Sequence, residues 1–135
     1  MPTAKIRHVA ISTENPRATA DWYKDVFGLQ EVGTNGRDGI YLSDGEINFA
    51  VLRIVDRATG QVLTGVHHFG FAVDDADAYY AKMAEVGAER QPDIATHAQY
   101  FESKFTGPDG QTVDISEHGW LGSAPVAEAQ ASTTR

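Results

Sequence analysis

The apolar and polar positions of the chain follow a strand period, then a helix period, and then a strand period again. Residues 5–13 (KIRHVAIST) are rich in β-branched side chains, which predicts a strand. Asn15 is a good helix N-cap, Pro16 suits a first helical turn, and Gly28 is typical of a helix end. Residues 29–56 hold three short β-type runs separated by the turn sequences TNG and SDG. This half of the chain therefore predicts the order βαβββ.

The same order begins again near residue 66. The run HHFGFAVDD (67–75) predicts a strand, and DADAYYAKMAEVGA (75–88) predicts a helix. Three more β-type runs follow: RQPDIA, AQYFESKFTG and TVDISEH. The offsets between matching residues are 60 for His8 and His68, 59 for Gly28 and Gly87, and 65 for Gly45 and Gly110. A unit repeated in this way predicts two tandem βαβββ modules and an α+β fold class.

The chain length fits one domain, because 135 residues can bury a sizeable core without further domains. We predict a single domain over residues 1–120, with module one at 5–56, a connector at 57–65 and module two at 66–120. Residues 121–135 lose aromatic and β-branched side chains and gain Ala, Ser and Thr. This composition predicts a flexible C-terminal tail.

Composition narrows the partners that the chain can have. Hydrophobic residues make up 41% of it, but no apolar run approaches the roughly 18 residues of a membrane span, which predicts a soluble protein. The formal charge of −8 argues against nucleic acid, because phosphate binding needs a basic surface. No secretory signal is visible and cysteine is absent, which fits a cytoplasmic protein. The expected partner is a small molecule, and any metal ligand must be His, Asp, Glu or an amide oxygen.

Two histidines occupy matching positions in the two modules. When RHVAIST is laid over HHFGFAV, His8 meets His68 rather than His67. Strand alternation places His8 and His68 on matching faces beside small residues, and it sends the side chain of His67 to the opposite face. The small neighbours leave room over that face, which favours a pocket.

The last strand of each module supplies a second pair of candidate ligands. Laying DGEINF over DGQTVDI with one residue deleted matches Asn48 to Asp114. Asp114 is flanked by Val113 and Ile115, so it faces the same side as the histidines if those two face the core. Two histidines and one aspartate suit Fe(II), Mn(II), Zn(II), Ni(II) or Co(II), and Asn48 could add an amide oxygen, which is a weaker ligand.

These features together resemble the vicinal oxygen chelate superfamily, which includes glyoxalases, methylmalonyl-CoA epimerases, extradiol dioxygenases and bleomycin-resistance proteins. The resemblance is carried by the paired modules, by HVAI and HFGF in the first strands, by WYKDVFGL in the first helix and by GPDGQTVDI near the end. It covers roughly residues 5–120 and implies a curved, barrel-like mixed sheet with a central cleft. It also implies a small-molecule substrate, a divalent metal ion and a homodimer.

The metal positions of this family fall on His8, Asn48, His68 and Asp114. Glyoxalases commonly carry Glu and epimerases Gln where this chain has Asn48, whose side chain is shorter, and Asp114 stands where Glu is usual. An aspartate is nevertheless a normal partner of two histidines in non-haem iron enzymes. The resemblance therefore favours Fe(II) or Mn(II), with Zn(II), Ni(II) and Co(II) as alternatives.

Extradiol dioxygenases of this family carry a histidine before the penultimate strand and a tyrosine within it. His97 lies at a compatible distance from Asp114, and by this resemblance it acts as the acid or base. Lys104 occupies the tyrosine position, and Tyr100 lies on the same strand face by parity. These three residues, His97, Tyr100 and Lys104, are the candidates for catalysis. The plainer interpretation of Lys104 is an ion pair with Glu102 on a solvated face.

Asn48 decides between the enzymatic hypotheses. Without it, two histidines and one carboxylate leave positions open for substrate and dioxygen, which favours an extradiol-type dioxygenase, the interpretation preferred from sequence. With it, a glyoxalase- or epimerase-like lyase or isomerase is favoured. Two other classes stay open: a metal-free protein that binds a small molecule, as bleomycin-resistance proteins do, and a non-catalytic partner subunit.

Overall fold

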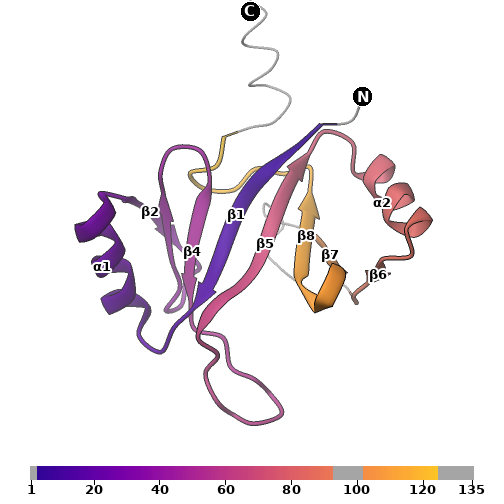
Figure 1. The fold of residues 1–135 in the computed structure, drawn as a ribbon. Helices are drawn as coiled ribbons and strands as arrows, with labels where there is room; N and C mark the ends of the chain where they lie inside the picture. The colour runs from indigo at the N-terminus through magenta and orange to yellow at the C-terminus, as the bar shows by residue number, and fades with distance from the viewer. Residues whose placement is uncertain (1–2, 93–101, 125–135) are drawn as a thin grey trace, which may run out of the picture. The chain divides into compact units, whose positions relative to one another are not determined.

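The computed structural model describes residues 3–92 and 102–124, and over them the elements follow the predicted order (Figure 1). The first module has β1 (Ala4–Ser12), α1 (Pro16–Phe27), β2 (Gln30–Thr34), β3 (Ile40–Ser43) and β4 (Asn48–Leu52). The second has β5 (Gly65–Val73), α2 (Ala76–Glu85), β6 (Glu89–Arg90), β7 (Ser103–Thr106) and β8 (Thr112–Ser116). These eight strands belong to a mixed sheet. The α+β class and the repeated βαβββ order are thereby confirmed.

The described residues form two compact units. One, the module-one unit, holds His8–His67 and Leu121–Ser123. The other, the module-two unit, holds the described residues of Met1–Arg7, His68–Trp120 and Ala124–Arg135. Strand β1 therefore contributes residues to both units. Most of the predicted C-terminal tail lies outside the described residues.

The module-one unit is built around the parallel pair of β1 and β4. Its strands follow the order β2-β3-β4-β1, and β3 is antiparallel to both β2 and β4. Five buried residues from these strands and α1 form its core: Ile11, Ala20, Ile40, Leu42 and Val51. Because Ile11 and Val51 face this core, alternation turns the even-numbered residues of β1 and β4 to the other face of the sheet.

Helix α1 begins and ends where the sequence predicts. The Oδ1 of Asn15 accepts a hydrogen bond from the backbone N–H of Ala18 at 3.1 Å, and Pro16 occupies the first turn. Gly28 ends the helix in the left-handed region, with φ of 70°, and its N–H donates to the carbonyl of Lys24 at 2.9 Å. Neither α1 nor α2 is long and apolar enough to cross a membrane.

The module-two unit repeats the plan around the parallel pair of β5 and β8. Its strands follow the order β5-β8-β7-β6, and β7 is antiparallel to β6 and β8. Its core joins three buried strand residues to side chains of α2: Val73, Phe105 and Ile115 with Tyr79, Tyr80 and Met83. The even-numbered residues of β5, β7 and β8 therefore face away from α2. His68, Lys104 and Asp114 are among them.

The two modules differ in the register of their parallel strands. In module one, His8 is directly opposite Asn48. In module two, Asp114 is opposite Gly70, two residues beyond His68. The residue opposite His68 is Thr112, so by strand register the counterpart of Asn48 is Thr112. The predicted counterpart, Asp114, lies two residues further along β8. An even displacement keeps each side chain on the same face as its histidine, so the pairing of faces survives.

Candidate metal centre

His8 and Asn48 lie side by side in the module-one unit. They are register partners on β1 and β4, and both are fully buried. The next residues on the same face are small, namely Ala10 and Ser12 on β1 and Ala50 on β4, and they are also buried. The histidine and the amide are therefore flanked on this face by small side chains.

The side-chain amide of Asn48 is held in one orientation. Its Nδ2 donates a hydrogen bond to the backbone carbonyl of Leu121 at 2.7 Å. Because a carbonyl oxygen only accepts, the NH2 group must face Leu121, and this fixes Oδ1 on the other side of the amide. Oδ1 is buried and finds no hydrogen-bond partner in the described part of the chain. A buried acceptor without a donor costs roughly 1–3 kcal/mol, so this oxygen is suited to receive a ligand such as a metal ion.

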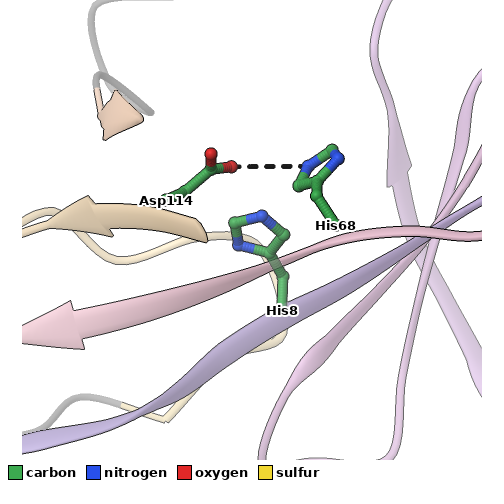
Figure 2. Close-up of side chains that lie close together, drawn as sticks. All are labelled: His8, His68 and Asp114. Carbon is green, nitrogen blue, oxygen red and sulfur yellow. Dashed lines mark ion pairs between the residues drawn. The ribbon is translucent and has the colours of Figure 1, made fainter. Parts of the chain in front are cut away.

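His68 and Asp114 face each other in the module-two unit. The Nε2 of His68 and the Oδ2 of Asp114 are 3.3 Å apart, as the dashed line in Figure 2 marks. Asp114 is fully buried and His68 is 7% exposed. Gly70, the register partner of Asp114, has no side chain to fill the space beside the carboxylate. The Asp114 carboxylate and the His68 imidazole are thus directed at each other in a site with little water.

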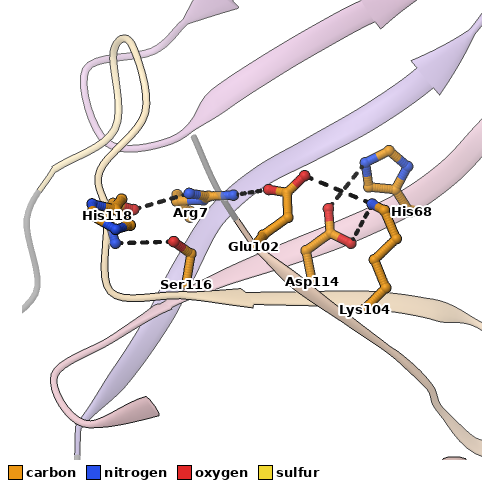
Figure 3. A network of polar contacts seen from close by, with 7 residues as sticks. All are labelled: Arg7, His68, Glu102, Lys104, Asp114, Ser116 and His118. Atoms are coloured by element: carbon orange, nitrogen blue, oxygen red, sulfur yellow. Dashed lines mark hydrogen bonds and ion pairs between the residues drawn. The ribbon is translucent and has the colours of Figure 1, made fainter. Parts of the chain in front are cut away.

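Lys104 lies on the other side of Asp114. The two are register partners on β7 and β8, and the Nζ of Lys104 is 2.8 Å from the Oδ1 of Asp114 (Figure 3). The Oε1 of Glu102 is 3.7 Å from the same ammonium, and the side chains of Lys104 and Glu102 are only 16% and 8% exposed. The expected ion pair of Lys104 with Glu102 is present, but the expectation that it lies on a solvated face is wrong. Alternation turns Phe105 toward α2, and it turns Lys104 toward Asp114.

A buried arginine completes this network. Arg7 has none of its surface exposed, and its Nη2 donates to the Oε2 of Glu102. Its Nη1 donates to the backbone carbonyl of His118 at 2.9 Å, and its guanidinium lies 4.9 Å from the centre of the Trp120 ring. A cation out of water needs such partners to offset its desolvation. Each carboxylate oxygen of Glu102 therefore faces one cation, Arg7 on one side and Lys104 on the other (Figure 3).

Burial shifts two pKa values in the network. The pKa of Glu102 is raised above its ordinary value of 4.5, first by burial and then by the negative charge of Asp114, although Arg7 and Lys104 act in the opposite direction. The pKa of the Arg7 guanidinium is lowered by burial, which the nearby Glu102 partly offsets. Both shifts have desolvation as their main cause, so the charges of this site lie in a medium of low polarity.

The remaining predicted residues are spread over the chain. His97 and Tyr100 lie outside the described residues. His67 is half-buried, and by alternation its side chain leaves β5 on the face opposite to that of His68. The doublet of histidines therefore contributes one side chain, His68, to the face that carries Asp114.

Sequence reasoning missed Arg7 and Glu102 as parts of the site. Arg7 directly precedes His8, and a charged residue inside a strand of mostly buried residues is a signal for an internal partner. Glu102 lies two residues before Lys104, so strand alternation puts both side chains on the same face. This spacing is a signal that could have placed both on the face of Asp114. Their pairing spans 95 residues, however, so only the tertiary fold reveals that Arg7 and Glu102 meet.

A cavity of about 560 Å³ lies elsewhere in the module-two unit. It is lined by the end of α2 and by parts of β6, β7 and β8, including Met83, Phe105 and Val113. Phe105 and Val113 are the chain neighbours of Lys104 and Asp114, and alternation turns them to the opposite face. This cavity is therefore separate from the candidate ligands.

A family model describes most of the chain. The model of the Glyoxalase/Bleomycin resistance protein/Dioxygenase superfamily matches residues 5–115. The chain belongs to this superfamily. The resemblance drawn from the strand motifs and the repeated modules is thereby confirmed. A comparison with curated proteins finds no match.

Solved structures of this superfamily share the fold at low sequence identity. A variant of Streptomyces coelicolor methylmalonyl-CoA epimerase in complex with 2-nitronate-propionyl-CoA is 18% identical, with a TM-score of 0.63 over 82% of this chain and 94% of that chain. The 2,3-dioxygenase LapB from Pseudomonas sp. KL28 is 18% identical, with a TM-score of 0.68 over 88% of this chain and 42% of that chain. Methylmalonyl-CoA epimerase from Mycobacterium tuberculosis is 17% identical, with a TM-score of 0.64 over 85% of this chain and 88% of that chain. At these identities the likeness shows the fold alone.

Proposed function

We propose that the protein is a metal-dependent enzyme that transfers a proton on a small substrate bound through two adjacent oxygen atoms. In this proposal a divalent ion is held by His8, His68 and Asp114, the three side chains drawn in Figure 2, and by the Oδ1 of Asn48. The observation that carries it is the buried Oδ1 of Asn48, which has no hydrogen-bond partner in the described residues. A fourth ligand favours an isomerase or lyase over an oxygenase, because fewer positions are left for dioxygen.

The donor chemistry fits a divalent ion of the first transition row. His8, His68 and Asp114 are buried, and each has one ligand atom to offer. Imidazole nitrogens combined with carboxylate and amide oxygens suit Mn(II), Fe(II), Co(II), Ni(II) and Zn(II). Fe(II) and Mn(II) remain the first choices from the sequence resemblance.

When bound, the ion would supply Lewis-acid stabilisation of negative charge on the substrate oxygens. Lys104 would add a second positive charge beside Asp114, where its side chain keeps 16% of its surface exposed. His97, outside the described residues, is proposed as the group that accepts or returns the substrate proton, and Tyr100 as a group that positions the substrate. Arg7 and Glu102 hold Lys104 in place without touching the substrate in this proposal.

An extradiol-type dioxygenase is the second candidate. The observation that favours it is the set of two histidines and one carboxylate, which by itself is the ligand set of non-haem iron dioxygenases. It requires that the Asn48 amide stays out of the coordination sphere, so that substrate and dioxygen can both bind. The shared fold of the LapB dioxygenase does not transfer its activity at 18% identity.

Metal binding is the first test, by titration of Co(II) into protein freed of metal with a chelator. His68→Gln should weaken binding by roughly 100-fold, because a first-row ion loses one of its few strong ligands. His67→Gln is the matched control: it removes the neighbouring imidazole from the opposite face and should bind like wild type. Wild-type protein that takes up no Co(II) at micromolar concentration, either alone or with an added chelating anion, would overturn the proposal in favour of metal-free binding.

The reaction is tested on metal-loaded protein. The assay follows, by NMR, the exchange of a substrate C–H proton with D2O over a panel of 2-hydroxy acids, 2-oxo acids and acyl thioesters. We expect the wild type to catalyse this exchange and Asn48→Ala to lose it. A dioxygenase would instead consume oxygen with a catechol and form a yellow ring-cleavage product. It would keep both activities in Asn48→Ala.

A further inference from the structure

Among the described residues, the lysine and arginine side chains of the network around Asp114 equal its carboxylates in number. The buried network joins two cations, Arg7 and Lys104, to two carboxylates, Glu102 and Asp114 (Figure 3). All four belong to the module-two unit, and the most exposed of the four side chains is that of Lys104, at 16%. Within the part of the chain that the structure describes, the carboxylate of Asp114 is therefore already paired with a lysine before an ion binds.

We propose that Lys104 is the resident counter-ion of Asp114, and that it makes the site bind a divalent ion together with an anionic chelating ligand rather than the ion alone. This inference rests on the proposed function and names the substrate class of the same site. The substrate is then an anion with two adjacent oxygens, such as a 2-hydroxy or 2-oxo carboxylate, and a neutral diol is a poor ligand.

The geometry lets Lys104 stay in place when a metal ion binds. Its ammonium contacts the Oδ1 of Asp114 at 2.8 Å, while the Oδ2 of the same carboxylate faces the Nε2 of His68 at 3.3 Å. One oxygen is thus held by the lysine, and the other is on the side of the proposed ligand His68. Glu102 also lies against this ammonium, with its Oε1 3.7 Å from the Nζ of Lys104, and Arg7 in turn donates a hydrogen bond to Glu102.

Electrostatics then decides what binds. A divalent ion brings two positive charges to within reach of the Lys104 ammonium, and the repulsion is large because the surroundings are buried. The single negative charge of Asp114 would then have to offset both the ion and Lys104. The negative charge of Glu102 already lies between Arg7 and Lys104. An anionic ligand supplies the missing negative charge to both the ion and the exposed part of Lys104.

The test measures Co(II) affinity of the full chain by calorimetry, alone and with saturating glycolate, an anion with two adjacent oxygens. Glycolamide, which has similar shape and no charge, is the matched probe. In wild type we expect glycolate to tighten Co(II) binding about tenfold or more and glycolamide to leave it nearly unchanged. In Lys104→Met we expect Co(II) alone to bind about tenfold tighter than in wild type, and the effect of glycolate to fall below about threefold.

Two further variants separate charge from structure. Lys104→Arg keeps the charge and should behave like wild type, whereas Lys82→Met removes an exposed lysine of α2 and should change nothing. If circular dichroism finds Lys104→Met unfolded, Lys104→Gln takes its place with the same expected result. Lys104→Met or Lys104→Gln binding Co(II) no tighter than wild type, or Lys104→Arg binding as tightly as they do, would overturn the inference.

The failure of this inference differs from the failure of the proposed function. Wild-type protein that binds Co(II) tightly, and equally well with glycolate or glycolamide, overturns the counter-ion role and leaves the metal enzyme standing. Protein that binds no Co(II) in any variant, with or without glycolate, overturns both.

Discussion

The decisive residue is Asn48, because a single side-chain oxygen separates the two enzymatic hypotheses. An asparagine can satisfy the Leu121 carbonyl with its NH2 group and still offer an oxygen to a metal ion. A glutamate or aspartate at the same position has only acceptors, so it would face the Leu121 carbonyl with a negative charge. The amide is therefore the side chain that suits both neighbours, the backbone carbonyl on one side and a cation on the other.

Replacing Asn48 by aspartate should make the stability of the protein depend on metal. Without metal, Asn48→Asp loses the bond to Leu121 and brings two acceptors together, which should lower the free energy of unfolding by roughly 1–3 kcal/mol. With saturating Co(II), the added carboxylate becomes a stronger ligand and the loss should largely disappear. Urea unfolding with and without Co(II) measures both values. An equal loss under the two conditions would argue that the position 48 side chain does not reach the ion.

Glu102 and Glu31 should respond to acid in opposite ways. The pKa of Glu102 is raised above 4.5 by burial, so its contribution to stability is present below pH 4.5 and is lost as the pH rises through its folded value. The pKa of Glu31 is lowered from 4.5 to about 2 by hydrogen bonds from Arg17 and Lys24. Its contribution is therefore present above pH 4.5 and is lost as the pH falls toward 2.

Glutamine variants of Glu31 and Glu102 test how each carboxyl group changes the free energy of unfolding with pH. In urea unfolding from pH 2 to 8, Glu31→Gln should flatten the loss of stability on the acid side, and Glu102→Gln should flatten the loss above pH 4.5. Each variant serves as the control of the other, since both remove one carboxylate. Two variants with the same change of slope would contradict the opposite pKa shifts.

At the scale of elements, the sequence is most informative where local chemistry defines the structure. Asn15, Pro16 and Gly28 predict both ends of α1, because a cap and a left-handed glycine act within a few residues. The register of β4 and β8 could not be predicted in the same way. With a one-residue deletion, the sequences DGEINF and DGQTVDI align Asn48 with Asp114. The strand ladders instead make Thr112 the counterpart of Asn48, because Asn48 pairs with His8 and Thr112 pairs with His68. Only the tertiary structure distinguishes these two alignments.

The N-cap of α1 gives a test of this local argument. Asn15→Ala removes the acceptor of the Ala18 N–H and should lower the free energy of unfolding by about 1 kcal/mol. Asn15→Asp keeps an acceptor at the same place and should cost only a small fraction of that. The measurement is chemical denaturation at neutral pH. A loss of the same size in both variants would mean that the cap bond does not account for the effect.

At the scale of the whole molecule, the repeat predicts which residues are equivalent but not which of them interact. His8, His68 and Asp114 follow from matching the modules and from strand parity, because both depend on sequence spacing alone. The Arg7–Glu102 pair and the Asn48–Leu121 bond join residues 95 and 73 positions apart. Such contacts carry no periodic signal, and they are the ones that orient the Asn48 amide and hold Lys104.

The two modules should act on one ion, and metal-linked stability can test this. A ligand that binds only the folded state at 100 times its Kd adds about 2.7 kcal/mol to the free energy of unfolding, which raises the Tm by several degrees. His8→Gln and His68→Gln should each abolish the increase produced by Co(II), and the double variant should lose nothing more, because one ion cannot be lost twice. His67→Gln should keep the full increase. If the losses of Co(II)-induced stabilisation in the two single variants instead add up in the double variant, each module binds its own ion. The single site proposed from the repeat would then be wrong.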